Sequence, residues 1–290
     1  MRLSSRTVIA AVALAGMPAL AMAQSRRVLA SGDPETQLMG YYAAVMQFAP
    51  SGFMPAGSRL EIGGDLTLIP PLSAADRTVG FGGTKQEKTN FCPVLPRLRA
   101  GASFGRTAVE AGLTPPVTVC GVKATLFSVA VARRLPLSET WGAVVRASAL
   151  AGTLDAAITC GADAIADPAD RTCFGGNISQ DQVKPLTFAL DGAITYAGWR
   201  RHGLEPYVLL GVRRERVDFA VNYTRPSATV TLPALDDHER FRATLTRVHV
   251  AAGAAWELSA RLRLGGEFFY APGALLTVRG RASVALGSPS

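Results

Sequence analysis

Charged residues are scarce in this sequence of 290 residues. Only 18% of them are Asp, Glu, Lys or Arg, whereas a water-soluble domain usually carries about 25%. The chain is nevertheless 48% hydrophobic, with 29 glycines. Beyond the first 23 residues it has no apolar run approaching the roughly 20 residues that a transmembrane helix needs. If the chain contacts lipid, it must do so without helices.

The usual spacing of a metal site is also missing. The chain has three histidines and four cysteines, with no Cys-x-x-Cys spacing. The stretch Gly80–Lys85 (GFGGTK) lacks the spacing of a phosphate-binding loop and the helix that should follow one. We therefore interpret it as a flexible outer loop, and we expect no metal and no cofactor.

The first 23 residues have the three parts of a secretory signal. Arg2 and Arg6 precede the apolar run Thr7–Leu20, and Ala21-Met22-Ala23 supplies the small residues of a cleavage site. Cleavage after Ala23 would export the chain and lower its net charge from +8 to +6. Export argues against nucleic acid as a partner, although a pI near 9.7 would otherwise suggest it.

Alternation of apolar and polar residues is the dominant pattern. Leu262, Leu264, Phe268 and Tyr270, for example, alternate with Arg261, Arg263 and Glu267, as in a strand with one apolar face. The same reading predicts ten strands, at 58–69, 95–104, 107–115, 122–134, 141–158, 186–199, 205–222, 241–256, 260–270 and 275–286. Near Arg213–Arg216 and Thr246–Arg247 the alternation slips, which predicts either a bulge or a strand continuing beyond a membrane.

Three features favour a membrane barrel over a soluble one. Most segments reach the ~9–11 residues that a tilted transmembrane strand needs. Short connections, such as Gly105-Arg106, take turns with mostly longer ones, such as Thr159–Pro185. Trp141, Trp199 and Trp256 all fall at strand ends beside short connections, where an aromatic girdle belongs.

From about Ser58 to Leu286 the chain resembles bacterial outer-membrane β-barrel proteins as a class. The resemblance implies an all-β, closed, antiparallel up-and-down barrel of about ten strands, with short periplasmic turns and longer outer loops. Outer-membrane lipid and the barrel-insertion machinery would be its partners. The oligomeric state is not predicted.

Residues 24–57 form a separate N-terminal segment before the barrel at 58–290. Asp33 can cap a helix at 34–48, Pro34 suits its first position, and Leu38, Tyr42, Val45 and Met46 share one face. The alternative is an eleventh strand at 39–48. We favour the helix, partly because ten strands return both chain ends to the periplasm.

The polar face of the strands collects charge. Arg or Lys in mid-membrane lipid costs ~2–4 kcal/mol, so we expect these side chains to face the lumen. There they would either pair and plug it or form a basic constriction that favours anions. The predicted lumen charges are Glu61, Asp65, Arg97, Arg99, Glu110, Lys123, Arg133, Arg146, Asp191, Arg261, Arg263, Glu267, Arg279 and Arg281.

The cysteines test this topology. If the first strand runs outward, Cys92 and Cys120 emerge in outer loops on one side, and Cys160 and Cys173 share a further outer loop. In an exported chain disulfides persist, so we predict the pairs Cys92–Cys120 and Cys160–Cys173.

For function, the sequence favours a non-enzymatic barrel, either structural or a small, weakly permeable pore with an arginine-rich lumen. One alternative is an omptin-like protease, because Asp236 and His238 are similar to the Asp-x-His pair of those ten-stranded enzymes. The matching acidic pair is not found in the other loops. A soluble periplasmic ligand-binding barrel is the second alternative.

Overall fold

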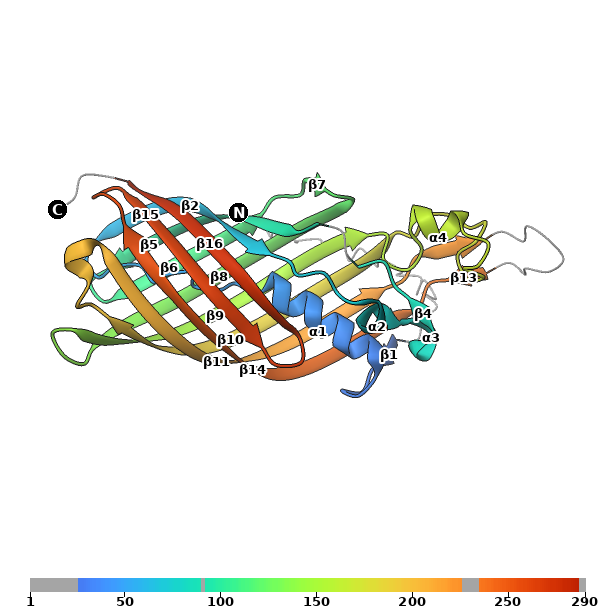
Figure 1. The fold of residues 1–290 in the computed structure, drawn as a ribbon, viewed down its shortest axis with the longest axis horizontal. Helices are drawn as coiled ribbons and strands as arrows, with labels where there is room; N and C mark the ends of the chain where they lie inside the picture. The colour runs from blue at the N-terminus through green and yellow to red at the C-terminus, as the bar shows by residue number, and fades with distance from the viewer. Residues whose placement is uncertain (1–25, 90–91, 226–234, 287–290) are drawn as a thin grey trace, which may run out of the picture.

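Ten antiparallel strands close into a barrel in the computed structural model, which describes residues 26–89, 92–225 and 235–286 (Figure 1). Each strand pairs with the next along the chain, and the last pairs with the first. The barrel strands are β2 (Arg59–Leu68), β5 (Val94–Phe104), β6 (Thr107–Thr114), β8 (Val122–Pro136), β9 (Trp141–Ala156), β10 (Asp181–Tyr196), β11 (Leu204–Ala220), β14 (Arg240–Glu257), β15 (Leu262–Ala271) and β16 (Leu275–Leu286).

This architecture confirms the predicted fold and strand count. We call the end of the barrel with the short connections the turn end, and the opposite end, with the long connections, the loop end. The long connections carry only short elements: α2 (Ala74–Arg77), β3 (Thr78–Val79), α3 (Gly80–Gly83), β4 (Lys85–Gln86), β7 (Thr118–Val119), α4 (Ala162–Ala166), β12 (Tyr223–Arg225) and β13 (Leu235–Asp237). At the turn end, η1 (Arg200–His202) lies between β10 and β11.

The two slips in alternation are not bulges. Pairing between β11 and β14 is continuous from Leu204↔Trp256 to Ala220↔Arg240. The strands instead change character along their length. Toward the turn end, β11 directs Val208 and Leu210 outward, whereas nearer the loop end it directs Arg214 and Arg216 outward and buries Val217. The strands therefore continue past the lipid, which is the second explanation that the sequence offered.

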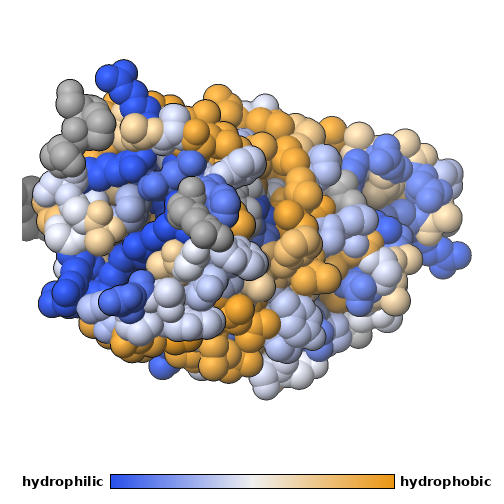
Figure 2. Space-filling model, turned by 60° about the vertical axis from the view of Figure 1, so that its left-hand side comes forward, coloured by the Kyte–Doolittle hydropathy of each residue, from blue (hydrophilic) through white to orange (hydrophobic). Residues whose placement is uncertain are grey.

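The outer wall of the barrel carries the apolar residues that a lipid-facing surface needs. Large hydrophobic side chains are exposed there along the strands, and Figure 2 shows them around the wall between more hydrophilic ends. Trp141, Trp199 and Trp256 are about half exposed at the turn end, and the ring of Tyr196 contacts Trp141 and Trp199 at 4.8 and 5.8 Å between centroids. Among the described residues, no helix is long and apolar enough to cross a membrane.

The N-terminal segment begins at the loop end and then runs inside the barrel. β1 (Arg26–Val28) pairs in parallel with the start of β14, at the loop end. Helix α1 (Pro34–Met46) and the residues after it then descend the lumen until the amide of Gly57 donates to the carbonyl of Gly105 at the turn end. The first barrel strand begins and the last one ends at the turn end, as ten strands require, but the described chain itself starts at the loop end. The predicted signal peptide, 1–23, lies outside the described residues.

Helix α1 is buried on all its faces because the protein surrounds it. Every residue from Leu38 to Met46 is buried, so the prediction of a single apolar face was incomplete. Pro34 occupies the first turn as predicted, but Asp33 makes no side-chain cap and instead accepts a hydrogen bond from the amide of Ala30 at 2.8 Å. The favoured helix at 34–48 is confirmed over Pro34–Met46, and the alternative of an eleventh strand at 39–48 is wrong.

Candidate functional site

The candidate site is the lumen, where arginines from the barrel wall bind the backbone of the N-terminal segment. At the C-terminus of α1, Arg279 donates to the carbonyl of Ala44 at 3.0 Å and Arg97 to that of Met46 at 2.7 Å. The last carbonyls of a helix have no partner within it and carry partial negative charge. Two guanidinium groups therefore satisfy and neutralise the end of α1.

The residues after α1 are held in the same way. Arg146 donates to the carbonyl of Phe48 at 2.9 Å, and Arg134 to that of Met54 at 2.7 Å. Further carbonyls in this stretch accept from Arg99 and Arg263. We name residues 44–54 the clasped segment. No barrel strand pairs with it, so wall arginines replace the hydrogen bonds that a sheet would have given its backbone.

The ring of Phe48 forms a second contact with the same arginines. The guanidinium carbons of Arg97, Arg99 and Arg146 lie 5.3, 4.2 and 5.2 Å from its centroid. A cation within about 6 Å of an aromatic face is attracted to it, and more strongly when water is excluded. Phe48 is only 1% exposed, so it anchors the clasped segment by both packing and charge.

Carboxylates on neighbouring strands balance the arginines. Arg146 lies 3.0 Å from Asp191, Arg99 contacts Asp65, and Arg281 contacts Glu110. A charge taken out of water is costly unless it is paired and fully hydrogen-bonded. The lumen approaches this condition by giving most arginines a carboxylate on one side and a backbone carbonyl on the other, although some guanidinium Nε atoms, such as those of Arg146 and Arg279, have no hydrogen-bond partner among the described residues.

Eleven of the fourteen predicted lumen charges are buried in the lumen. The other three are corrections. Lys123 points outward near the loop end of β8, beyond the lipid, where an outward polar side chain is favourable. Arg133 points outward at the turn end, and its neighbour Arg134 takes the inward position. Arg261 is exposed in the turn before β15.

Sequence reasoning missed several inward polar residues. Arg134 pairs with Glu205, Arg213 pairs with Glu215, and His249 Nε2 lies 2.9 Å from Asp191. The signal for Arg213 and Glu215 was the slip in alternation itself, because an unbroken period of two through the slip places both side chains inward. No signal in the sequence indicated that the clasped segment lies among them.

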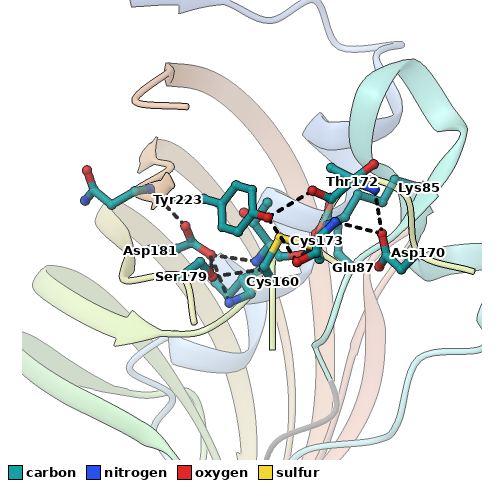
Figure 3. The surroundings of a disulfide bond; sticks show 12 residues. Lys85, Glu87, Cys160, Asp170, Thr172, Cys173, Ser179, Asp181 and Tyr223 are labelled. Atoms are coloured by element: carbon teal, nitrogen blue, oxygen red, sulfur yellow. Dashed lines mark hydrogen bonds and ion pairs between the residues drawn. A yellow bond between two sulfur atoms is a disulfide. The ribbon is translucent and has the colours of Figure 1, made fainter. Parts of the chain in front are cut away.

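The loop end is cross-linked covalently and by hydrogen bonds. Both predicted disulfides, Cys92–Cys120 and Cys160–Cys173, are present. Near the second one, the buried carboxylate of Asp181 accepts hydrogen bonds from the amides of Ile158 and Thr159 and from the hydroxyl of Ser179 (Figure 3). These contacts fix the chain after β9 against the start of β10.

A second polar contact lies beside this disulfide. Lys85 is buried, 2.9 Å from Glu87, and donates to the carbonyl of Thr159 (Figure 3). The pKa of Glu87 is raised to about 7, chiefly by burial and in smaller part by the nearby Asp181 and Asp170, although Lys85 opposes them. The stretch Gly80–Lys85, which includes the short helix α3, is thus held against the loop end of the barrel by Lys85.

Of the residues considered for catalysis, His238 is exposed, with Nδ1 3.2 Å from the side-chain oxygen of Asn222. The backbone of Asp236 lies in β13, paired with Thr224. Within the described residues no group of three or more His, Cys, Asp or Glu could hold a metal ion.

The closed antiparallel barrel with an apolar wall defines the class of protein, a transmembrane β-barrel. No family model matches the sequence, and no curated protein matches it.

Among solved structures, the chain is similar to bacterial outer-membrane β-barrel proteins. Ail, the attachment invasion locus protein of Yersinia pestis, is 10% identical, with a TM-score of 0.32 over 80% of this chain and 97% of that one. The translocator domain of the autotransporter NalP from Neisseria meningitidis is 10% identical, with a TM-score of 0.34 over 88% and 96%. The Pseudomonas putida toluene transporter TodX is also 10% identical, with a TM-score of 0.34 over 84% and 70%. At these identities and TM-scores the likeness implies no shared function.

Proposed function

We propose that this protein is a non-enzymatic barrel of the bacterial outer membrane whose lumen is closed by its own N-terminal segment. The observation that supports the proposal is the set of buried arginines that donate to the backbone of residues 44–54. A ten-stranded barrel is only slightly wider than an eight-stranded one, which its side chains fill. A helix and an extended chain in that space leave little room for ions. Export by a signal cleaved after Ala23 belongs to the same proposal.

Closure by the segment differs from closure by side chains alone. In the second case the wall charges would pair across the lumen and block it without help. Arg146 and Arg279, however, each divide their donors between a carboxylate and a carbonyl of the clasped segment. If the segment were withdrawn, these arginines would face water in a lumen about as wide as a helix, and such a lumen would favour anions.

Planar-bilayer conductance tests the proposal. The full chain should show no steps above background. A variant lacking residues 29–55 should show steps of several-fold above background that prefer anions, provided that it still migrates as a folded barrel in unheated gels. The control is a deletion at the loop end that removes residues 162–166, which form α4. This variant should show no conductance, because α4 contains no buried residue and does not enter the lumen.

Two outcomes would contradict the proposal. Stable conductance by the full chain would mean that the segment does not close the barrel. A folded but silent deletion variant would mean that the wall side chains close it alone.

The protease alternative has less support. His238 contacts Asn222, and the acidic pair that an omptin-like protease would need is not found in the sequence of the other loops. We therefore keep the non-enzymatic role as the proposal.

A further inference from the structure

A cavity of about 260 Å³ lies at the loop end, between α1 and the ends of β11 and β14. Its walls are mostly apolar, from Leu38 and Met39 of α1, Phe219 of β11, Val221 just beyond β11, Phe241 of β14, and Ile158. Arg27 and Glu239, both exposed, form part of its lining, so the cavity is open to the outside. An engineered apolar cavity of about 150 Å³ holds benzene, and this one has room for two fused rings.

One polar group on the wall of this cavity lacks a partner. Tyr42 is 7% exposed, and its hydroxyl has no hydrogen-bond partner among the described residues. Its neighbour Tyr41, by contrast, donates from its hydroxyl to the carbonyl of Pro70 at 2.6 Å. Buried hydroxyls are almost always satisfied, because an unpaired one forfeits its hydrogen bonds to water. The Tyr42 hydroxyl is therefore a group to which a ligand could bond.

A second, smaller cavity adjoins the same tyrosine. It has a volume of about 70 Å³, lies against the opposite wall and is lined by Tyr42, Thr89 and Thr114 among mostly apolar residues. The hydroxyls of Thr89 and Thr114 are also buried without a partner among the described residues. The two cavities thus combine apolar walls with a few unused hydroxyls, as expected of small-molecule sites.

The charges near the larger cavity limit the ligand. Glu35, Glu87 and Glu239 line it against a single cation, Arg27, and Glu87 already contacts Lys85 at 2.9 Å. An anionic ligand would face this acidic excess in a largely apolar space and would lose its hydration. A neutral ligand avoids both costs.

We propose that the loop-end cavity binds a small, neutral, mostly apolar molecule with one hydroxyl, which hydrogen-bonds to the hydroxyl of Tyr42. This goes beyond closure of the lumen, and it rests on the proposed function only in requiring α1 to be seated at the loop end, because Leu38, Met39 and Tyr42 of α1 line the cavity.

A pair of ligands that differ by one hydroxyl tests the proposal. Equilibrium dialysis would measure binding of 2-naphthol and of naphthalene to the full-length protein in lipid nanodiscs, with empty nanodiscs subtracted. The native protein should bind 2-naphthol saturably and about 3–10-fold more tightly than naphthalene, as one hydrogen bond allows. Tyr42→Phe should remove that preference and leave naphthalene binding unchanged. Tyr41→Phe is the matched control and should keep the preference.

Filling the cavity provides a separate test. Val221 is 5% exposed on the cavity wall, and Val221→Phe should weaken both ligands at least 10-fold while the barrel keeps its heat-modifiable migration. Equal binding to the native protein and to Val221→Phe would overturn the site. Saturable binding that Val221→Phe abolishes but Tyr42→Phe leaves unchanged would overturn the hydroxyl ligand. Neither result depends on the conductance measurements, so this proposal and the proposed function can fail separately.

Discussion

The membrane part and the loop end of this barrel are filled in opposite ways. In the membrane part, apolar residues such as Leu190 and Leu210 face outward, and charges such as Arg146 and Asp191 fill the lumen. At the loop end of the same strands, Lys184 and Arg214 face outward, while Val183 and Val217 pack inward against the core around α1. The same sheet therefore has apolar residues outside and charges inside in its membrane part, and polar residues outside and apolar residues inside at its loop end. The solvent outside each part decides the arrangement.

This difference explains the two roles of the N-terminal segment. Its helix supplies the apolar filling that a conventional barrel core requires, and its extended residues supply carbonyls to a charged lumen that would otherwise have unpaired donors. The change occurs near the end of α1, where Arg97 and Arg279 receive the last carbonyls. The segment is thus matched to both environments along its length.

The largest effect is expected in the charged part. Arg146→Ala should lower the free energy of unfolding by about 3–5 kcal/mol, because it leaves Asp191 buried beside His249 alone and the carbonyl of Phe48 without its donor. Urea unfolding in lipid vesicles measures this. Arg214→Ala, an exposed arginine on β11, is the control and should stay within ~0.5 kcal/mol.

The double replacement of Arg146 by Met and Asp191 by Leu sharpens this test. Removing both charges together should recover part of the loss, since no unpaired carboxylate remains. If Arg146→Ala alone were nearly neutral, pairing would not be what stabilises the lumen, and the contrast between the two parts would lose its energetic basis.

A smaller change in stability should locate, on strand β10, the boundary between the membrane part and the loop end. Leu190 and Lys184 both point outward from β10. Leu190→Lys should cost about 2–4 kcal/mol, because it places an ammonium in the lipid, whereas Lys184→Leu should change stability by less than ~0.5 kcal/mol. The same vesicle-based unfolding applies. Similar costs at the two positions would mean that the lipid boundary does not lie between them.

The features that could be predicted from the sequence are those that follow from the residues on the outer face of the strands. Outward apolar residues repeat with a period of two wherever lipid lies outside, so the ten strands, the connections and both disulfides could be predicted. Lys123 was misplaced because the rule that polar residues face inward was applied beyond the lipid, where it reverses. The clasped segment could not be predicted, because backbone carbonyls bind arginine whatever their side chains are, and so leave no pattern in the sequence.

The smallest effect belongs to the loop end and concerns pH. The pKa of Glu87 is raised from 4.5 to about 7, chiefly by burial. Between these two values the folded chain keeps a proton that the unfolded chain has released, so stability should fall as pH rises through this interval and level off above it. With each pKa unit worth about 1.4 kcal/mol, the fall in stability between pH 5.5 and the raised pKa of about 7 should be about 2 kcal/mol. Glu87→Gln cannot titrate and should abolish the slope, whereas Glu139→Gln, at an exposed carboxylate in a turn-end connection, should preserve it.

Hydrogen exchange measures this change at the amide of Lys88, which donates to the carbonyl of Ile158 at 2.9 Å. Exchange rates at pH 5.5 and 8 are compared after correction for intrinsic exchange. A slope of the opposite sign would show that the ion pair with Lys85 outweighs burial, and that the loop end, like the membrane part, is stabilised by its charges.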